Sequence, residues 1–198
     1  MFYIFAFITA YLIAAINPAI VISKKVLKQD IRNLGSKNAG TTNAIRTMGK
    51  GMGALVFVLD LLKVVISYGL ICIIGWIFKE NVSSSIKSLY MLASVLGHSY
   101  PVYYGFKGGK GVAVFLMSAI IVDAKIAAIC IAIGVATIIV SRMVSLGSMV
   151  GSIMLVILDI FIRTNYNFIL ITLVVFVVIY NHRENISRIL AGKENKLF

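Results

Sequence analysis

The sequence has few of the charged residues that a soluble protein carries on its surface. Charged side chains make up 13% of its 198 residues, against about 25% in soluble domains. Hydrophobic residues make up 60%, and the mean hydropathy is +0.99. A single soluble core of this length could not bury so much apolar surface, whereas lipid can surround it. The composition therefore predicts one domain, residues 1–198, that is an integral membrane protein.

Cysteine, acidic residues and nucleotide-binding motifs are also scarce. Cys72 and Cys130 both lie inside apolar runs, which excludes a disulfide framework and offers no metal-ligand spacing. The seven Asp and Glu form no cluster that would hold magnesium on a diphosphate. The sequence has no Gly-x-Ser-x-Gly elbow, zinc-binding helix or dinucleotide fingerprint. We expect no metal and no cofactor.

Apolar runs divide the chain into seven expected spans. The first run lacks a basic segment before it, and Lys24 and Lys25 follow it, so we expect a retained span rather than a cleaved signal peptide. Several runs are shorter than the roughly 20 residues that cross a bilayer comfortably, and the fourth could be a half-span or be joined to the fifth. The expected spans are residues 2–22, 53–78, 89–104, 112–122, 126–140, 144–162 and 166–180.

The distribution of basic residues favours seven separate spans. With the N-terminus outside, segments 23–50, 105–111, 141–145 and 181–198 face the cytoplasm and hold 14 Lys and Arg, against four in the outer loops. Joining the short fourth and fifth spans would place five of those cations outside, against the positive-inside rule. We therefore predict an all-α fold of seven transmembrane helices with a cytoplasmic C-terminus. The net charge of +12 then suits anionic lipid and phosphorylated substrates, and nucleic acid is not expected as a partner.

Two polar loops carry candidate anion sites. Residues 30–46 combine glycines with small hydroxyl and amide side chains between arginines, and such groups can bind a phosphate or carboxylate. A solvated basic loop explains this segment about equally well. The second loop, Gly105-Phe-Lys-Gly-Gly-Lys-Gly111, can direct backbone N–H groups at an anion beside a helix N-terminus. Its spacing is not that of an ATP-binding P-loop.

Other polar residues stand out because they lie in or beside apolar runs. His98 and His182 both fall where a span is expected to meet the cytoplasm, and each alone is more often structural than catalytic. Asp60 and Lys63 are three residues apart inside the second span and so share one helix face. Ionisable residues in a membrane indicate function, although a self-neutralising pair is the competing interpretation. We expect this pair to support the cytoplasmic loops.

Together these segments resemble the bacterial acyl-phosphate:glycerol-3-phosphate acyltransferases over nearly the whole chain. The motifs are Gly-Ser-Lys-Asn-Ala-Gly-Thr-Thr-Asn-Ala-Ile-Arg46, Asp60-Leu-Leu-Lys63, Gly97-His-Ser-Tyr-Pro101 with the glycine-rich loop, Arg142-Met-Val-Ser-Leu146 and His182-Arg-Glu-Asn-Ile-Ser-Arg188. Five motifs in this order are highly specific. The chain departs from the family pattern at Lys37, Thr41, Ala19 and Val64, none of which removes a group assigned to chemistry.

The resemblance implies a function in the bacterial cell membrane. A fatty acyl group would pass from acyl phosphate to the 1-hydroxyl of glycerol 3-phosphate at the cytoplasmic face, giving lysophosphatidic acid and phosphate, the first step of phospholipid synthesis. The partners would be these substrates and membrane lipid, and a monomer is expected. An alternative is a membrane carrier for organic phosphates or other anions, although no sequence repeat supports it.

We assign the candidate residues to three groups. The general base is left open between His182 and a substrate phosphate, whose pKa values of about 6.5 and about 6 both suit the task. Catalytic roles are expected for Ser36, Arg46, Lys107, Ser145, His182 and Asn185. Substrate binding is expected for Asn38, Thr42, Asn43, Gly108, Gly109, Lys110, Gly111, Arg142 and His98, and supporting roles for Asp60 and Lys63.

Overall fold

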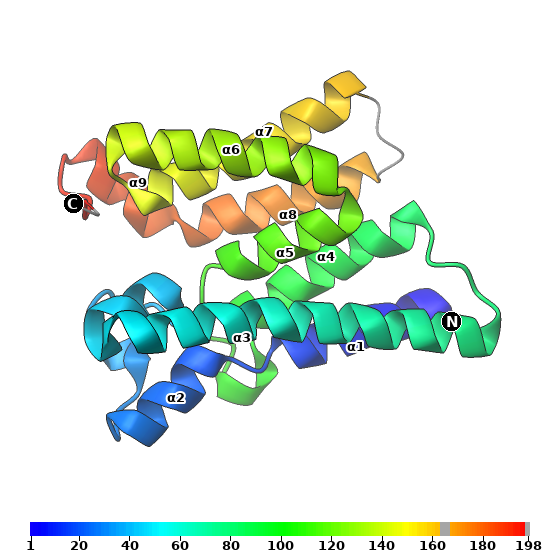
Figure 1. The fold of residues 1–198 in the computed structure, drawn as a ribbon, viewed down its shortest axis with the longest axis horizontal. Coiled ribbons are helices and arrows are strands. Elements are labelled where there is room, and N and C mark those ends of the chain that lie inside the picture. The colour runs from blue at the N-terminus through cyan, green and yellow to red at the C-terminus, as the bar shows by residue number, and fades with distance from the viewer. Residues whose placement is uncertain (163–166, 197–198) are drawn as a thin grey trace.

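The computed structural model describes residues 1–162 and 167–196, and the elements in this part of the chain are helices. Figure 1 shows them as a bundle whose longest member, α3, runs along its full length. The α-helices are α1 (Phe2–Ala14), α2 (Pro18–Val26), α3 (Thr41–Phe78), α4 (Ser84–Ser99), α5 (Val112–Val122), α6 (Ala124–Ser141), α7 (Val144–Ile162), α8 (Phe168–Asn181) and α9 (Arg183–Leu190). Two short 3-10 helices are η1 (Ile31–Asn33) and η2 (Val102–Tyr104).

Helix length and apolarity support a multi-pass membrane protein. Four helical segments of the described chain are long and apolar enough to cross a membrane, or five if the bent pair α8–α9 is one span. Large apolar side chains cover the outside of the bundle, including Trp76 at 82% exposure and Phe161 at 79%. Lipid rather than water is the medium that such a surface requires.

Two of the expected spans differ from the helices at the ends that meet the polar loops. The first span, expected as residues 2–22, is broken between α1 and α2, because Asn17 caps α2 through its side chain and Pro18 occupies the first helical turn. The second, expected from residue 53, begins at Thr41 and includes a non-helical Gly49 with φ of 87°. Polar residues 41–48 therefore form a helical segment that apolar runs alone do not reveal.

The other expected spans agree with the helices to within a few residues, with one exception. The third span, expected as 89–104, ends at Ser99, and η2 follows. Helices α5 and α7 have the expected bounds, and Asp123 separates α5 from α6 by capping α6 with its side chain. Tyr166, expected to begin the last span, lies outside the described residues.

Helices α6 and α7 pack so closely that their backbones are almost in contact at three glycines. A Cβ atom placed on Gly134 of α6 would lie 3.0 Å from the carbonyl oxygen of Gly147, and one on Gly151 would lie 3.0 Å from that of Cys130. Small residues allow such close packing between helices in lipid, where dispersion contacts replace the hydrophobic effect.

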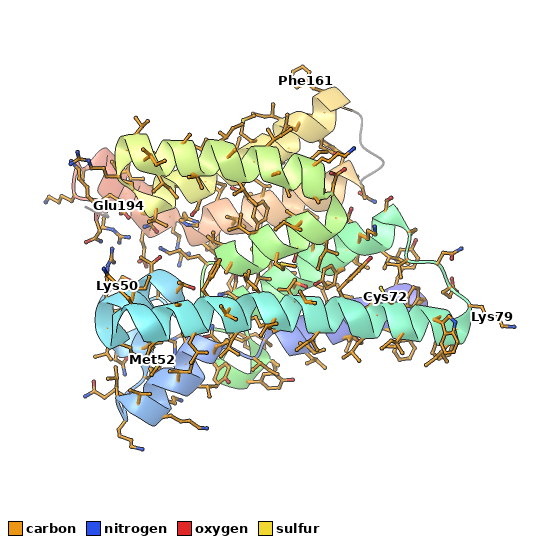
Figure 2. The ribbon with its side chains drawn as sticks, in the orientation of Figure 1. Lys50, Met52, Cys72, Lys79, Phe161 and Glu194 are labelled. Carbon is orange, nitrogen blue, oxygen red and sulfur yellow. The ribbon has the colours of Figure 1, made fainter. Side chains whose placement is uncertain are left out.

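The polar loops gather at one end of the bundle. Figure 1 shows α2, the start of α3, α9 and the C-terminus at this end, and the N-terminus toward the other. In Figure 2, Lys50 and Glu194 lie at the loop end and Lys79 lies at the opposite end. The fold therefore brings together segments that are more than a hundred residues apart in sequence.

Candidate active site

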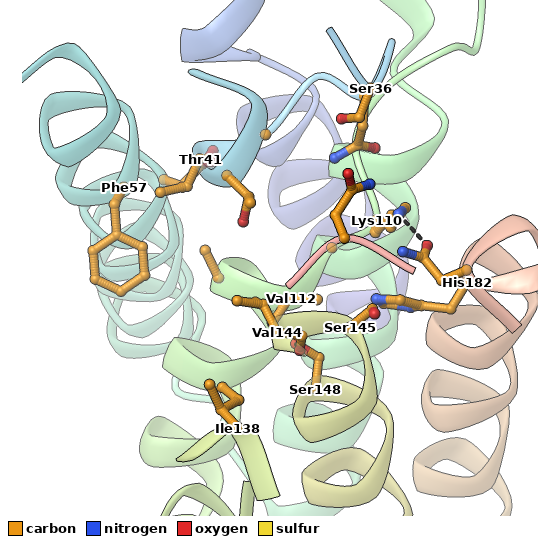
Figure 3. A pocket seen from close by; sticks show the side chains of 18 of the residues that line it. Ser36, Thr41, Phe57, Lys110, Val112, Ile138, Val144, Ser145, Ser148 and His182 are labelled. Carbon is orange, nitrogen blue, oxygen red and sulfur yellow. Dashed lines mark hydrogen bonds between the residues drawn. The ribbon is translucent and has the colours of Figure 1, made fainter. Parts of the chain in front are cut away.

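A cavity of about 300 Å³ opens among the polar loops. Figure 3 shows Ser36, Lys110, Ser145 and His182 directed at this space from four separate segments. The walls also include the start of α3 and the C-terminal segment after α9. The predicted site residues that line it are Ser36, Asn38, Thr42, Arg46, Asp60, His98, Lys110, Gly111, Ser145, His182 and Asn185.

Asn43 shapes the loop before α3 rather than lining the cavity. Its side chain is fully buried, and its amide nitrogen donates to the carbonyl oxygens of Ile31 and Leu34 at 3.2 and 2.9 Å. Its amide oxygen accepts the backbone N–H of Ser36 at 2.8 Å. These three bonds give Asn43 a structural role that fixes the backbone of the loop at Ser36, and its expected role in substrate binding stays a prediction.

Arg32 joins the first loop to the glycine-rich loop. Its guanidinium donates to both carboxylate oxygens of Asp30 at 2.9 and 2.8 Å, and to the carbonyl oxygens of Tyr104 and Lys107 at 2.8 and 3.0 Å. The hydrogen bond from Arg32 is the main cause that lowers the pKa of Asp30 to about 2. The charge-assisted hydrogen bonds of Arg32 thus hold the two polar loops together.

The glycine-rich loop packs against the end of α4 so closely that glycine is required. The backbone N–H groups of Gly108 and Gly109 donate to the carbonyl oxygens of Ser99 and His98 at 3.0 and 3.2 Å. A Cβ on Gly109 would lie 2.6 Å from the carbonyl oxygen of Ala39. Gly111 then begins α5 with φ of 82°, a left-handed conformation that favours glycine. Gly108 and Gly109 do not line the cavity but position Lys110, which does.

Lys110, Asn185 and Glu194 form a connected polar wall. The Lys110 ammonium donates to the side-chain oxygen of Asn185, whose nitrogen donates to Glu194 Oε1 at 2.7 Å. The same carboxylate oxygen accepts from Ser145 Oγ at 2.9 Å, and Oε2 accepts from Arg188 Nε at 2.8 Å. Burial alone would raise the pKa of Glu194, but the hydrogen bonds from Asn185, Arg188 and Ser145 outweigh it, and the net effect lowers this pKa. Glu194 therefore orients three cavity residues at once.

The cavity carries excess positive charge. Arg46, Lys110 and Arg188 all line it. Burial, followed by repulsion from Arg188, lowers the pKa of Lys110 to about 8. Asp60 and Glu194 also line the cavity, so three cations face two carboxylates and the lining keeps a net positive charge that suits an anion.

His182 is buried at the junction of α8 and α9 with a defined hydrogen bond. Its Nδ1 lies 2.8 Å from the carbonyl oxygen of Val178, which can only accept, so Nδ1 carries the proton. Burial is the main cause that lowers its pKa to about 4, so the imidazole is neutral near pH 7. Its Nε2 is then free to accept a hydrogen bond from a hydroxyl, and the pKa of about 4 makes this imidazole a weaker base than the ordinary value of about 6.5 would.

Three further predicted site residues do not line the cavity, and two ionisable residues that do line it were not predicted. Lys107 has an exposed side chain and does not line the cavity, and neither does Arg142, a left-handed residue at the end of α6. Lys63 lies beneath the cavity. The two unpredicted ionisable residues are Arg188 and Glu194, for which the sequence motifs predict no role. Arg188 is the last residue of the motif that begins at His182, and Glu194 follows it by six residues. In the described residues no group of three or more His, Cys, Asp or Glu is placed to hold a metal.

A second, apolar cavity of about 80 Å³ adjoins the first. It lies among α5, α6 and α7, and four residues line both cavities: Val112, Leu116, Ile138 and Ser148. Its deeper lining includes Ala119, Ala127 and the glycines of the α6–α7 contact. The site thus combines a cationic compartment with an apolar one, an arrangement that suits an amphipathic anion.

Comparison with known proteins gives the family. The family profile described as glycerol-3-phosphate acyltransferase matches residues 4–192. The chain belongs to this family, as the motifs predicted. A relative named glycerol-3-phosphate acyltransferase from Thermoanaerobacter pseudethanolicus is 41% identical over 198 residues, covering 100% of this chain and 96% of that protein. One of the same name from Aquifex aeolicus is 38% identical and covers 98% of both.

Solved structures agree with this assignment. The crystal structure of PlsY, an integral membrane glycerol 3-phosphate acyltransferase, in its glycerol 3-phosphate form superposes with a TM-score of 0.85 at 36% identity. It covers 98% of this chain and 94% of that one. The form of PlsY with lysophosphatidic acid gives a TM-score of 0.82. The all-helical membrane fold expected from the sequence is therefore confirmed.

Proposed function

We propose that the protein transfers a fatty acyl group from acyl phosphate to the 1-hydroxyl of glycerol 3-phosphate. The observation that carries this proposal is the contact between a cationic cavity and an apolar cavity that share four lining residues. An acyl phosphate has a phosphate at one end and an alkyl chain at the other, and so matches both compartments. Family membership supports the same reaction.

The phosphates bind among the cations and small hydroxyls. Arg46, Lys110 and Arg188 supply charge, while Ser36 and Thr42 supply short hydrogen bonds from the opposite loop. The acyl chain extends into the apolar cavity between α5 and α7. Ser148 lines both cavities and Ser145 lines the cationic one, so the acyl carbonyl would pass beside these two hydroxyls.

The reaction needs no acyl-enzyme, because acyl phosphate is already an activated mixed anhydride. The 1-hydroxyl oxygen attacks the acyl carbon, the bond from that carbon to the phosphate oxygen breaks, and inorganic phosphate leaves. The hydroxyl proton passes to Nε2 of His182, with a substrate phosphate as the competing acceptor. Holding both substrates in a reactive orientation can lower the activation free energy by several kcal/mol. Stabilisation of the developing oxyanion lowers it further.

A direct assay separates this function from the rival carrier. Purified protein in detergent, given palmitoyl phosphate and glycerol 3-phosphate without added metal, is expected to release phosphate and form lysophosphatidic acid. Absence of release, together with uptake of glycerol 3-phosphate into proteoliposomes, would favour the carrier. Palmitoyl phosphate without glycerol 3-phosphate is the control for hydrolysis.

We also propose the seven-span topology with the active site at the cytoplasmic face of the cell membrane. Helix α5 has only 11 residues, roughly half of a bilayer's hydrocarbon thickness at 1.5 Å per residue. It can be short because it begins at the cavity wall, where Gly111 and Val112 lie, rather than at the membrane surface. The basic residues gathered at the loop end support a cytoplasmic orientation.

Cysteine labelling tests this orientation. With Cys72 and Cys130 replaced by alanine, Lys50→Cys is expected to resist a membrane-impermeant maleimide in intact cells, and Lys79→Cys to react. Both should react once the membrane is permeabilised. The reverse pattern in intact cells would invert the topology without affecting the assay of purified protein.

A further inference from the structure

Lys63 is a buried ammonium that three elements hold in place. Its side chain is 7% exposed within α3. Its Nζ donates to the carbonyl oxygen of Ile16 at 2.9 Å, contacts His98 Nδ1 at 2.9 Å and pairs with Asp60 Oδ1 at 2.8 Å. The helix break after α1, the second span and the end of α4 therefore meet at one cation.

These contacts determine which nitrogen of His98 carries the proton. An ammonium has donors and no acceptor, so the His98 Nδ1 that faces it must accept. A neutral imidazole has one N–H, which then resides on Nε2. In the opposite tautomer, Nδ1–H of His98 could donate to Asp60 Oδ1, but these two atoms are 3.4 Å apart. The same N–H would also face the Lys63 ammonium, which is nearer, at 2.9 Å.

The His98 ring lies at the wall of the cavity. His98 is 3% exposed overall and lines the cationic cavity. A Cβ on Gly109 would lie 3.1 Å from His98 Cδ2 and closer still to Nε2. The ring therefore packs against the glycine-rich loop at Gly109. Because Nδ1 faces Lys63 and Asp60, Nε2 is the ring nitrogen that remains for a ligand in the cavity.

We propose that Asp60 and Lys63 are positioning residues that fix His98 as a hydrogen-bond donor to a substrate phosphate oxygen. Lys63 imposes the Nε2–H form, and Asp60 balances the ammonium so that it remains charged inside the bundle. The phosphate belongs to glycerol 3-phosphate or to the acyl donor, and the kinetic test below distinguishes the two. The identity of this ligand rests on the proposed function, whereas the tautomer does not.

Nitrogen-15 NMR of the histidine-labelled protein in detergent tests the tautomer directly. The sequence has two histidines, so the His182→Gln variant assigns the signals. In the wild-type protein we expect a protonated Nε2 and an unprotonated Nδ1 for His98, and added glycerol 3-phosphate or palmitoyl phosphate should shift the Nε2 signal. An Nδ1–H tautomer or an imidazolium at His98 would overturn the proposal.

A pair of substitutions tests the role of the donor. In His98→Gln the side-chain amide reaches the position of Nε2, and in His98→Asn it reaches only that of Nδ1. We expect His98→Gln to retain kcat/KM within about tenfold and His98→Asn to lose about 10²-fold, the loss typical for removal of one oxyanion donor. The substrate whose KM rises identifies the phosphate. Equal losses in two variants with the same unfolding temperature would contradict the proposal.

The positioning role has its own readout. In Lys63→Met we expect the His98 signals to change to the Nδ1–H form or to a mixture, with kcat/KM reduced about as much as in His98→Asn. An unchanged tautomer in a folded Lys63→Met protein would show that Lys63 does not set it. If the wild-type protein shows the expected tautomer but releases no phosphate, the proposed function fails and the tautomer assignment stands.

Discussion

The two histidines of the protein line the same cavity but are hydrogen bonded in opposite senses. His98 accepts from a lysine through Nδ1, so that its free edge is a donor. His182 donates to a backbone carbonyl through Nδ1, so that its free edge is an acceptor. The same side chain therefore has two different chemical properties, and the group behind each ring decides which one the substrate meets.

This difference fits the two requirements of acyl transfer to an alcohol. Phosphate oxygens and a developing oxyanion need donors, and the attacking hydroxyl needs an acceptor for its proton. His98 is backed by a buried charge pair in the helix bundle, and His182 by the last turn of α8. The donor depends on tertiary contacts and the acceptor on local helix geometry, so they should respond differently to substitution.

The same replacement at both histidines tests this comparison with the largest expected effect. His182→Gln removes the only base we assign to the enzyme, so kcat should fall at least about 10²-fold, within the range of general-base catalysis. His98→Gln, its matched control, should stay within about tenfold. Phosphate release from palmitoyl phosphate measures both. If kcat of His182→Gln falls by less than about tenfold, a substrate phosphate is the main base.

Removing the Lys110 cation should have the next largest effect. Lys110→Met deletes a charge-assisted hydrogen bond, worth roughly 1.5–3 kcal/mol, so kcat/KM should fall about 10- to 100-fold by the usual conversion of 1.36 kcal/mol per tenfold. The loss should appear mainly in KM, because a charge that binds phosphate acts in the ground state as well. Lys125→Met, an exposed lysine at the start of α6, is the control. A similar loss in both variants would refute a specific role for Lys110.

The pH profile should show a plateau bounded by these two groups. His182 is in its neutral form above its pKa of about 4, and Lys110 is charged below its pKa of about 8. Values of kcat/KM should therefore fall as the pH rises above about 8, because the free enzyme loses a phosphate-binding cation. In Lys110→Arg the alkaline limb should move to higher pH, while the acidic limb, which follows His182, should stay where it is. An unmoved alkaline limb would assign it to another group.

The smallest effect is expected at the far end of the apolar cavity. Ala127 lines that cavity and is 1% exposed, whereas its neighbour Ala128 faces outward. Ala127→Leu should fill part of the space and shift preference several-fold from palmitoyl toward lauroyl phosphate, and Ala128→Leu should not. Competition between the two donors measures this ratio. An unchanged ratio for Ala127→Leu would mean that the chain lies elsewhere.

Much of the fold could be predicted because lipid imposes simple rules on sequence. The apolar runs predicted both ends of α5 and of α7 correctly, and Asp123 marked the break between α5 and α6. Apolar runs gave the wrong helix bounds for α1, α2 and α3. Polar residues begin α3 at Thr41, before the apolar run starts, and Asn17 interrupts the first apolar run between α1 and α2. An Asn-Pro pair is typical of the start of a helix, but Asn17 and Pro18 lie inside a long apolar run that hides this signal.

The candidate site was predicted in composition but not in arrangement. Family motifs identified most of the residues that line the cavity, yet Asn43 and Lys107 do not line it. The Asn43 amide instead donates to the carbonyl oxygens of Ile31 and Leu34, because buried carbonyl oxygens need hydrogen-bond donors. Glu194 was missed because an acidic residue near the end of the chain has no periodicity to mark it, and its partners Ser145 and Arg188 are known only once the chain is folded.

The sequence by itself determined that this is a helical membrane protein of the glycerol-3-phosphate acyltransferase family. Hydropathy and ordered motifs are properties of the chain, and they do not depend on which segments meet. Only the tertiary structure decided how each polar residue is used. The protonated nitrogen of a histidine is set by its neighbour, and for His98 that neighbour is Lys63, 35 residues away in sequence and 2.9 Å away in space.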